Sequence, residues 1–328
     1  MDDHDEKEDV GKLKAFLYSP GVQFVLQRLE LIAFVINLFL VALFLAVVCY
    51  GLAIQLLHLP EVLQPLYIMA PVALVLFCFL HSLFALGWHL GIFYFLLVIF
   101  GSYLAEEFGV ASGILFGAYS YSDFAPAHVS YVPLEVPFSW YVILYIAMCV
   151  SDIIVNGMPH HRRYQPTLER KETMFKAFLL LIITSVVVVA WDMALDPLGS
   201  TRCSVWIYDS EDGFYFGVPA LNFFGWLVTS GFLTGAYLLV EYFFPPRFRS
   251  DPIRPYHGVL PLFVSAGFVA LYAVISQPEE LAMVSLASVG LPFLASVLRF
   301  VQEALFRFWK TRQHIQVEEG DLDIYEQF

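Results

Sequence analysis

Long apolar segments recur along the whole chain, and each is long enough to cross the hydrocarbon core of a bilayer as a helix, which takes about 20 residues. Prolines such as Pro60, Pro133 and Pro197 lie in most of the gaps and interrupt helical structure there. The sequence therefore predicts an all-α, polytopic transmembrane bundle of about eight spans, at roughly residues 31–56, 66–85, 87–107, 138–157, 175–195, 219–243, 258–276 and 282–302.

The composition excludes the main soluble classes. Of the 328 residues, 59% are apolar and only 14% are charged, whereas soluble domains carry about 25% charged residues. A soluble globular enzyme and a disordered chain are both inconsistent with these values. The net charge of -13 also argues against nucleic acid as a partner, because a polyanion is bound by basic surfaces.

The distribution of basic residues predicts the orientation of the chain. Membrane proteins concentrate Lys and Arg in their cytoplasmic loops. Both termini are therefore predicted to be cytoplasmic, because an even number of spans then places every basic residue except Arg202 on that side: Lys7, Lys12, Lys14, Arg28, Arg162, Arg163, Arg170, Lys171, Lys176, Arg247, Arg249, Arg254, Arg299, Arg307, Lys310 and Arg312.

The acidic residues gather at the two ends of the chain. Residues 1–9 hold six acids, and residues 313–328 hold five acids and no base. We expect solvated tails there. The predicted organisation is an acidic tail with a short amphipathic segment at 1–28, a transmembrane bundle at 29–303 with outer loops at 108–137 and 196–218, and an acidic tail at 304–328.

Several catalytic motifs are missing from the sequence. It has no C-x-x-C pair, no H-x3-H, no G-x-G-x-x-G, no Walker A motif, no H-E-x-x-H and no G-x-S-x-G. The four cysteines and nine histidines are scattered. We therefore predict neither a bound metal nor a cofactor.

The two outer loops are rich in aromatic residues. Residues 108–137 contain Tyr119, Tyr121 and Tyr131 but no Lys or Arg, and residues 196–218 contain Trp206 and Tyr208 among others. Aromatic residues of this kind are typical of a belt at the membrane interface. Alternatively, the loops fold back over the bundle and form the roof of an apolar cavity.

Polar residues are predicted to meet at the outer ends of four helices. The third predicted span ends at Glu106-Glu107, and the fifth ends at Asp192 and Asp196. Glu135 precedes the fourth, and Asn222 lies near the start of the sixth. Ionisable groups at helix ends can simply be solvated, but acids at the edge of an apolar bundle are costly unless they are paired or functional.

Asp192 and Asp196 are four residues apart, which places them on one face of a helix. Pro197 disfavours helical geometry at the preceding residue, so we expect the helix to end at Asp196. Two carboxyl groups so close together can share one proton because their charges repel. The pair is therefore a candidate acid catalyst.

Residues 100–235 contain four ordered motifs: Glu106-Glu107-Phe108-Gly109-Val110 with Gly113–Tyr121, Val132–Trp140, Asp192–Pro197 with Trp206, and Tyr215–Trp226. Together these motifs resemble the carotenoid-biosynthesis membrane family, whose best-known members are acyclic-carotenoid 1,2-hydratases of the CruF type such as bisanhydrobacterioruberin hydratase. Leu221 and Tyr208 depart from the pattern of that family, in which a small polar residue and a tryptophan are expected.

The resemblance implies that water is added across the terminal 1,2 double bond of an acyclic carotenoid end group. The partners would be a lipophilic polyene, water and membrane lipids, and the reaction needs no redox cofactor. The enzyme would be a hydro-lyase in a bacterial or archaeal cell membrane. Protonation of the alkene would give a tertiary carbocation, which water then captures.

The resemblance also implies roles for individual residues. Asp192 or Asp196 would be the general acid, with the other tuning it. Glu106 or Glu135 would position the water and take its proton, and Asn222 would hold the network. Six aromatic residues are expected to bind the substrate, and their rings can stabilise a cation: Trp191, Trp206, Tyr215, Trp226, Tyr121 and Trp140.

Other functions remain open at this point. The same acid could start cyclisation or isomerisation of a terpenoid, neither of which would change the mass of the substrate. A small-molecule transporter would instead carry charged groups near the bilayer midplane, where these spans have almost none. A purely structural assembly partner would leave the acidic cluster without a purpose.

Overall fold

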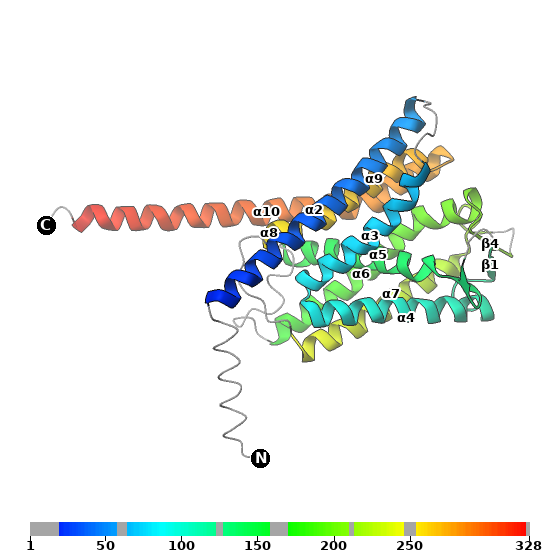
Figure 1. Cartoon of the computed structure of the whole chain (residues 1–328), viewed down its shortest axis with the longest axis horizontal. Coiled ribbons are helices and arrows are strands. Elements are labelled where there is room, and N and C mark those ends of the chain that lie inside the picture. Colours follow the sequence, from blue (N-terminus) through cyan, green and yellow to red (C-terminus); the bar gives the residue numbers. More distant parts are fainter. Residues whose placement is uncertain are drawn as a thin grey trace, which may run out of the picture.

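The computed structural model of the chain describes residues 20–57, 64–122, 127–157, 170–209, 213–245 and 254–325, and these residues form a helical bundle with four short strands (Figure 1). The predicted all-α polytopic bundle is confirmed. The helices are α2 (Pro20–Leu57), α3 (Gln64–Ala85), α4 (Trp88–Ser112), α5 (Glu135–Asn156), α6 (Arg170–Pro197), the π-helix η1 (Leu198–Arg202), α7 (Ala220–Phe243), α8 (Arg254–Gly258), α9 (Leu260–Ile275) and α10 (Glu279–Tyr325).

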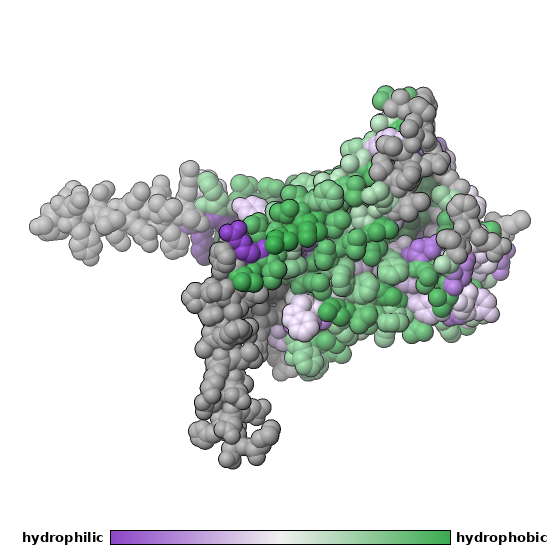
Figure 2. All heavy atoms as spheres, viewed as in Figure 1, coloured by the Kyte–Doolittle hydropathy of each residue, from purple (hydrophilic) through white to green (hydrophobic). Residues whose placement is uncertain are grey.

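Seven helical segments in the described part of the chain are long and apolar enough to cross a membrane, and α3 adds a shorter apolar stretch at Met69–Ala85. Each of the eight predicted spans therefore corresponds to a helical segment. The face shown in Figure 2 is largely apolar between the two ends of the bundle. These features mark the chain as an integral membrane protein, and the cytoplasmic placement of both termini stays a prediction.

The end of α6 differs from the sequence-based expectation. The helix continues through Asp196 to Pro197 and then widens into η1. The hydroxyl groups of Ser200 and Thr201 donate to the carbonyl oxygens of Asp196 and Pro197, and the Cys203 N–H donates to the Leu198 carbonyl at 2.9 Å. The wider turn and the hydroxyl donors satisfy backbone groups near the proline, so the prediction that the helix ends at Asp196 is wrong.

The structure describes only one of the two predicted tails over most of its length. Most of segment 1–28 lies outside the described residues, because the description begins at Pro20. Segment 304–328 is helical as far as Tyr325, since α10 continues without a break from the bundle into it (Figure 1). The basic loop with His160 and His161 also lies outside the described residues.

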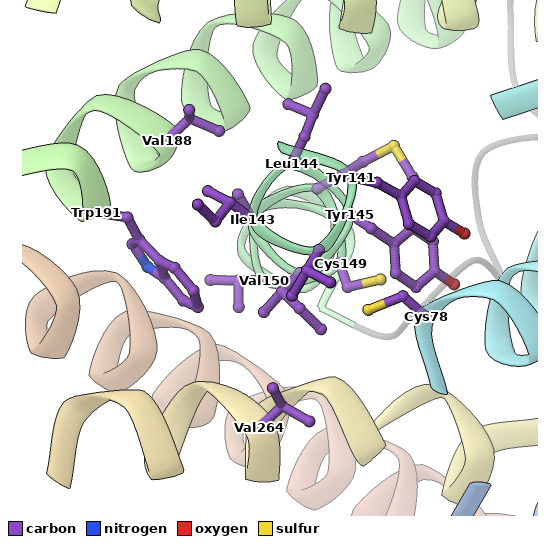
Figure 3. Close-up of a cluster of buried hydrophobic side chains, with 14 of the residues drawn as sticks. Cys78, Tyr141, Ile143, Leu144, Tyr145, Cys149, Val150, Val188, Trp191 and Val264 are labelled. Atoms are coloured by element: carbon purple, nitrogen blue, oxygen red, sulfur yellow. The ribbon is translucent and has the colours of Figure 1, made fainter. Parts of the chain in front are cut away.

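Helix α5 lies at the centre of the bundle. Its side chains are buried without interruption from Trp140 to Ile153, as expected for a helix that is apolar on all sides. Figure 3 shows the cluster around it, with Val188 and Trp191 of α6, Val264 of α9 and Cys78 of α3 facing the α5 side chains. The buried run begins at Trp140, close to the end of the bundle at which the acidic residues gather.

Two pairs of short strands connect the loops at that end of the bundle. Strand β1 (Tyr119–Tyr121) pairs with β4 (Trp206–Tyr208), and β2 (His128–Val129) pairs with β3 (Val132–Pro133), both antiparallel. The β1–β4 pair joins the loop after α4 to the loop after α6. The two aromatic loops thus fold over the bundle, as the second of the two sequence interpretations proposed.

Small residues allow α3 and α4 to approach each other closely. A Cβ atom at Gly91 would lie 2.8 Å from the Ser82 carbonyl oxygen and 2.9 Å from the Leu83 Cα atom. These are backbone atoms that cannot move aside. Gly91 follows Gly87 by four residues, a spacing of small residues that is typical of close helix contacts.

We predict that Gly91→Ala destabilises the bundle by about 1–3 kcal/mol, because the added methyl group overpacks a backbone contact. The measurement is thermal unfolding of the purified protein in detergent. Gly290→Ala is the control, since a Cβ atom there meets its nearest neighbour at 3.8 Å. Equal melting temperatures for the two variants would contradict the packing described here.

Candidate active site

Two buried carboxyl groups lie beneath the β1–β4 pair. Glu106 is on the last turns of α4, and Asp196 is on the last turn of α6. Their side chains are 5% and 1% exposed, respectively. An ionised carboxylate at such a position needs hydrogen-bond donors to offset the loss of water.

Glu106 receives three hydrogen bonds from aromatic side chains. The Trp140 indole N–H donates to Oε1 at 2.7 Å, and the Tyr121 hydroxyl donates to Oε2 at 2.8 Å. Tyr119 donates to the same Oε2. Burial, followed by the charge of Glu106, raises the pKa of both tyrosines above the ordinary value. Both phenols therefore keep the protons that they donate.

Asp196 is bound in a closely similar way. The Trp206 indole N–H donates to Oδ1 at 2.5 Å, and the Tyr208 hydroxyl donates to Oδ2 at 2.8 Å. The third donor is the Asn222 amide, which also donates to Oδ2. Burial, followed by the charge of Asp196, raises the pKa of Tyr208. Although Tyr208 departs from the family pattern, it keeps a donor at this position.

The alternation of side chains along each strand explains these contacts. In an extended strand, residues i and i+2 project from the same face. Tyr119 and Tyr121 therefore both reach Glu106, and Trp206 and Tyr208 both reach Asp196. The antiparallel register places Tyr119 opposite Tyr208 and Tyr121 opposite Trp206, so the two sets of donors lie side by side.

The segments around the two acids match in order and in contacts. A glycine follows each acid by three residues, and a Cβ atom at Gly109 or Gly199 would collide with an aromatic ring, Phe116 in one case and Trp206 in the other. Further along, Val132-Pro133 precedes Trp140 by the same spacing as Val218-Pro219 precedes Trp226. We call residues 102–140 the first acid unit and residues 192–226 the second.

The two acid units differ at several polar positions, and two of these differences form the acid pair. Asp192 of the second unit corresponds to Ser102 of the first, and Asn222 corresponds to Val136. The Asn222 amide donates to Asp192 Oδ2 at 2.9 Å as well as to Asp196, so it joins the two carboxyl groups. Asp192 Oδ1 is buried and has no hydrogen-bond partner among the described residues. The second unit alone therefore holds a linked pair of acids.

A cavity of about 590 Å³ lies between the two acid units and the neighbouring helices. Most of its wall is apolar. Among the predicted site residues, eight line it: Asp196, Glu106, Glu135, Asn222, Trp206, Trp226, Tyr121 and Trp140. Glu135 is exposed, so its carboxyl group lies at the rim.

Three predicted site residues lie outside the cavity wall. Asp192 lies behind Asn222 and is 1% exposed. Trp191 packs on Phe268, which does line the cavity, with ring centroids 5.0 Å apart. The Tyr215 hydroxyl donates to the Met193 carbonyl at 3.0 Å. The structure thus gives Trp191 and Tyr215 supporting positions behind the wall. Leu221, the other departure from the family pattern, is also outside the wall.

Two tryptophans form a stacked pair in the cavity wall. The Trp140 and Trp226 rings have centroids 3.8 Å apart and planes 15° apart. Trp140 belongs to the first acid unit and Trp226 to the second. Because Trp140 also donates to Glu106, its ring is fixed on one side by a hydrogen bond and on the other by stacking.

Sequence reasoning missed several residues of the wall. Tyr119 and Tyr208 donate to the two acids, and Phe116, Phe268 and Tyr272 complete the aromatic surface. The spacings Tyr119-x-Tyr121 and Trp206-x-Tyr208 were the signal for the two donors, since both predict one shared face on a strand. The positions of Phe268 and Tyr272 on α9 depend on helix packing and left no local signal.

The described residues contain no group of three or more His, Cys, Asp or Glu side chains that could hold a metal ion. Glu106 and Asp196 instead contact neutral donors. The prediction that the protein needs no metal or cofactor is not tested by this arrangement.

The fold and the site together define a membrane-embedded helical protein whose apolar cavity ends at buried carboxyl groups. The family model described as "Carotenoid biosynthesis protein" matches residues 63–291, and the chain belongs to this family. No curated protein and no solved structure matches the chain. The family match covers both acid units and most of the bundle.

We predict that the Trp140–Trp226 stack produces an exciton couplet in the circular dichroism spectrum, because the electronic transitions of two indoles 3.8 Å apart couple strongly. Trp140→Phe and Trp226→Phe should each abolish the couplet. Trp309→Phe is the control, since Trp309 is exposed and should leave the couplet unchanged. A couplet that survives both cavity substitutions would contradict the stacked geometry.

Proposed function

We propose that this protein is an acyclic-carotenoid 1,2-hydratase of the CruF type, a cofactor-independent hydro-lyase that adds water to the terminal double bond of an open-chain polyene. The observation that carries the proposal is the linked acid pair of Asp192 and Asp196, next to which a third acid, Glu106, lines the same apolar cavity. Membership of the carotenoid biosynthesis family supports a lipophilic polyene as the substrate.

The acid pair supplies the proton. Asp196 lines the cavity, whereas Asp192 lies behind Asn222. An ionised Asp192 would leave a buried oxygen unpaired, which costs about 1–3 kcal/mol, so the pair is best accommodated with one shared proton. Asp196 donates this proton to C2 of the terminal double bond. The π electrons form the new C–H bond, and C1 becomes a tertiary carbocation.

The aromatic wall stabilises the carbocation. Trp226 and Trp140 both line the cavity, and Trp206 and Tyr121 lie beside the acids. An aromatic face attracts a cation through its quadrupole, by about 2 kcal/mol or more when water is excluded. Trp191 and Tyr215, which were expected to bind the substrate, instead support this wall from behind.

Water completes the reaction at C1. Its oxygen forms the C–O bond, and its proton passes to a carboxylate of the cavity. Glu106 is held by three neutral donors, and Glu135 lies at the exposed rim, so the two candidates predicted as base both lie on the cavity. The proton then returns to the aspartate pair, and the net change is the addition of one water molecule.

We predict that cells accumulating lycopene convert it, when they express this chain, into a more polar pigment that is heavier by one water. The visible spectrum should be unchanged, because the terminal bond is not conjugated with the polyene. Liquid chromatography with mass detection is the measurement. A new pigment of unchanged mass would indicate isomerisation or cyclisation and would overturn the proposal of hydration.

We predict that Asp196→Asn and Asp192→Asn each lower conversion by about 10²–10⁴-fold, the usual contribution of a general acid. Asp209→Asn is the matched control, since Asp209 is exposed just after β4 and should convert lycopene normally. Membrane extraction and quantification of each variant show that it inserts. Near-normal conversion by both aspartate variants would exclude the acid pair as the proton source.

A second matched pair tests the first acid unit. Glu106→Gln should lower conversion because it removes a carboxylate from the cavity wall. Glu107→Gln changes the neighbouring acid, which accepts a hydrogen bond from Ser130 at 2.6 Å and does not line the cavity. Equal losses in the two variants would show that the effect does not come from the cavity.

A further inference from the structure

The cavity wall includes side chains that also lie on the outer surface of the bundle. Val72 and Leu76 of α3 line the cavity and are 56% and 48% exposed, and Phe138 of α5 lines it and is 36% exposed. A side chain can satisfy both conditions only at an opening. The cavity therefore opens sideways between α3 and the start of α5, on a surface that the spans place against lipid.

The buried polar groups of the cavity lie away from this opening, and the exposed Glu135 lies at its edge on the first turn of α5. Glu106, Asp196 and Asn222 are at the inner end, while the α3 part of the wall is entirely apolar. Ser139, at the α5 side, donates its hydroxyl to the Glu135 carbonyl at 3.0 Å, so its polar hydrogen is already used. An apolar chain can thus pass through the opening without displacing a hydrogen bond.

The cavity is too short to enclose a whole carotenoid. Its α5 wall extends from Glu135 to Ile143, which is roughly 12 Å at 1.5 Å per residue. The hydrocarbon core of a bilayer is about 30 Å thick, and a polyene long enough to cross much of it exceeds this depth. Only an end group fits inside, and the remainder must leave through the side.

The sequence of α3 favours an opening at this level. Pro71 lies inside the helix at the rim of the cavity. A proline removes one backbone hydrogen bond and bends the helix that contains it. Pro71 directly precedes Val72, so this interruption of the helical hydrogen bonds lies beside the opening.

We propose that the gap between α3 and α5 is a lateral binding site for a conjugated hydrocarbon chain, which lies with its end group at the acids and its remainder in the bilayer. The occupant is a polyene already dissolved in lipid. The identity of the occupant as a polyene and of its reacting end group rests on the proposed function. The binding site itself rests on the cavity wall and on the exposure of Val72, Leu76 and Phe138.

The test measures binding without turnover. The Asp196→Asn protein is expressed in lycopene-accumulating cells, purified in detergent, and examined for retained lycopene and its visible circular dichroism. Lycopene is achiral, so it acquires this signal only when a protein holds it in one twisted conformation. We expect the purified protein to retain lycopene and to show its visible circular dichroism, although this variant does not hydrate the pigment.

Matched substitutions on α3 then locate the site. Val72→Trp and Leu76→Trp, added to the Asp196→Asn protein, should lower retained lycopene at least fivefold because the larger rings fill the opening. Met69→Trp is the control, since Met69 is 47% exposed on the same helix and is not part of the wall. Leu76→Ala widens the opening and should keep binding, which separates blockage from misfolding.

Two results would overturn this proposal. Retention of lycopene by Val72→Trp and Leu76→Trp at the level of the control would show that the polyene binds elsewhere. Co-purification of phospholipid in place of lycopene, lost in the same two variants, would show that an acyl chain occupies the opening. If the Asp196→Asn protein retains lycopene but the unsubstituted protein does not hydrate it, the result would count against the proposed function. It would not count against the lateral binding site.

Discussion

The pairing of β1 with β4 is the interaction on which the site depends. Two carboxyl groups at the end of an apolar bundle are costly to bury unless donors surround them. The strands supply four of these donors, and their register sets Tyr119 and Tyr121 over Glu106 and Trp206 and Tyr208 over Asp196. Without this pairing, the two aromatic loops would have no common position, and each acid would lose two partners.

The match between the two acid units shows which residues each unit contributes to the site. Each unit provides one acid, two strand donors and one tryptophan of the stacked pair, so the cavity wall is built twice with nearly the same parts. The second unit alone has Asp192 and Asn222, which convert a single hydrogen-bonded acid into a linked pair. Under the proposed function, this difference separates the proton donor in the second unit from the carboxylate that receives the proton of water in the first.

Hydropathy was sufficient to predict the spans, because the cost of exposing backbone polar groups to lipid leaves few alternatives to helices. The convergence of Glu106, Asp196 and Asn222 followed from counting helix directions. The donors did not follow, since a strand of three residues is too short for its alternation to stand out from loop sequence. The family resemblance placed Trp191 and Tyr215 in the site. Helix rotation turns Trp191 toward Phe268 instead, and rotation within the bundle cannot be predicted from the local sequence.

A hydratase for a membrane-dissolved substrate has to bring together two reactants that avoid each other. The polyene is confined to lipid, and water is scarce there. The cavity offers each a different approach, because the apolar gap between α3 and α5 faces the bilayer while the exposed Glu135 carboxyl group marks the rim at the end of the bundle. The two approaches meet beside Glu106 and Asp196. Under the proposed function, a carbocation formed there is exposed to little water until one molecule reaches it from the rim. The separation that protects the cation then also determines the side from which the new C–O bond forms.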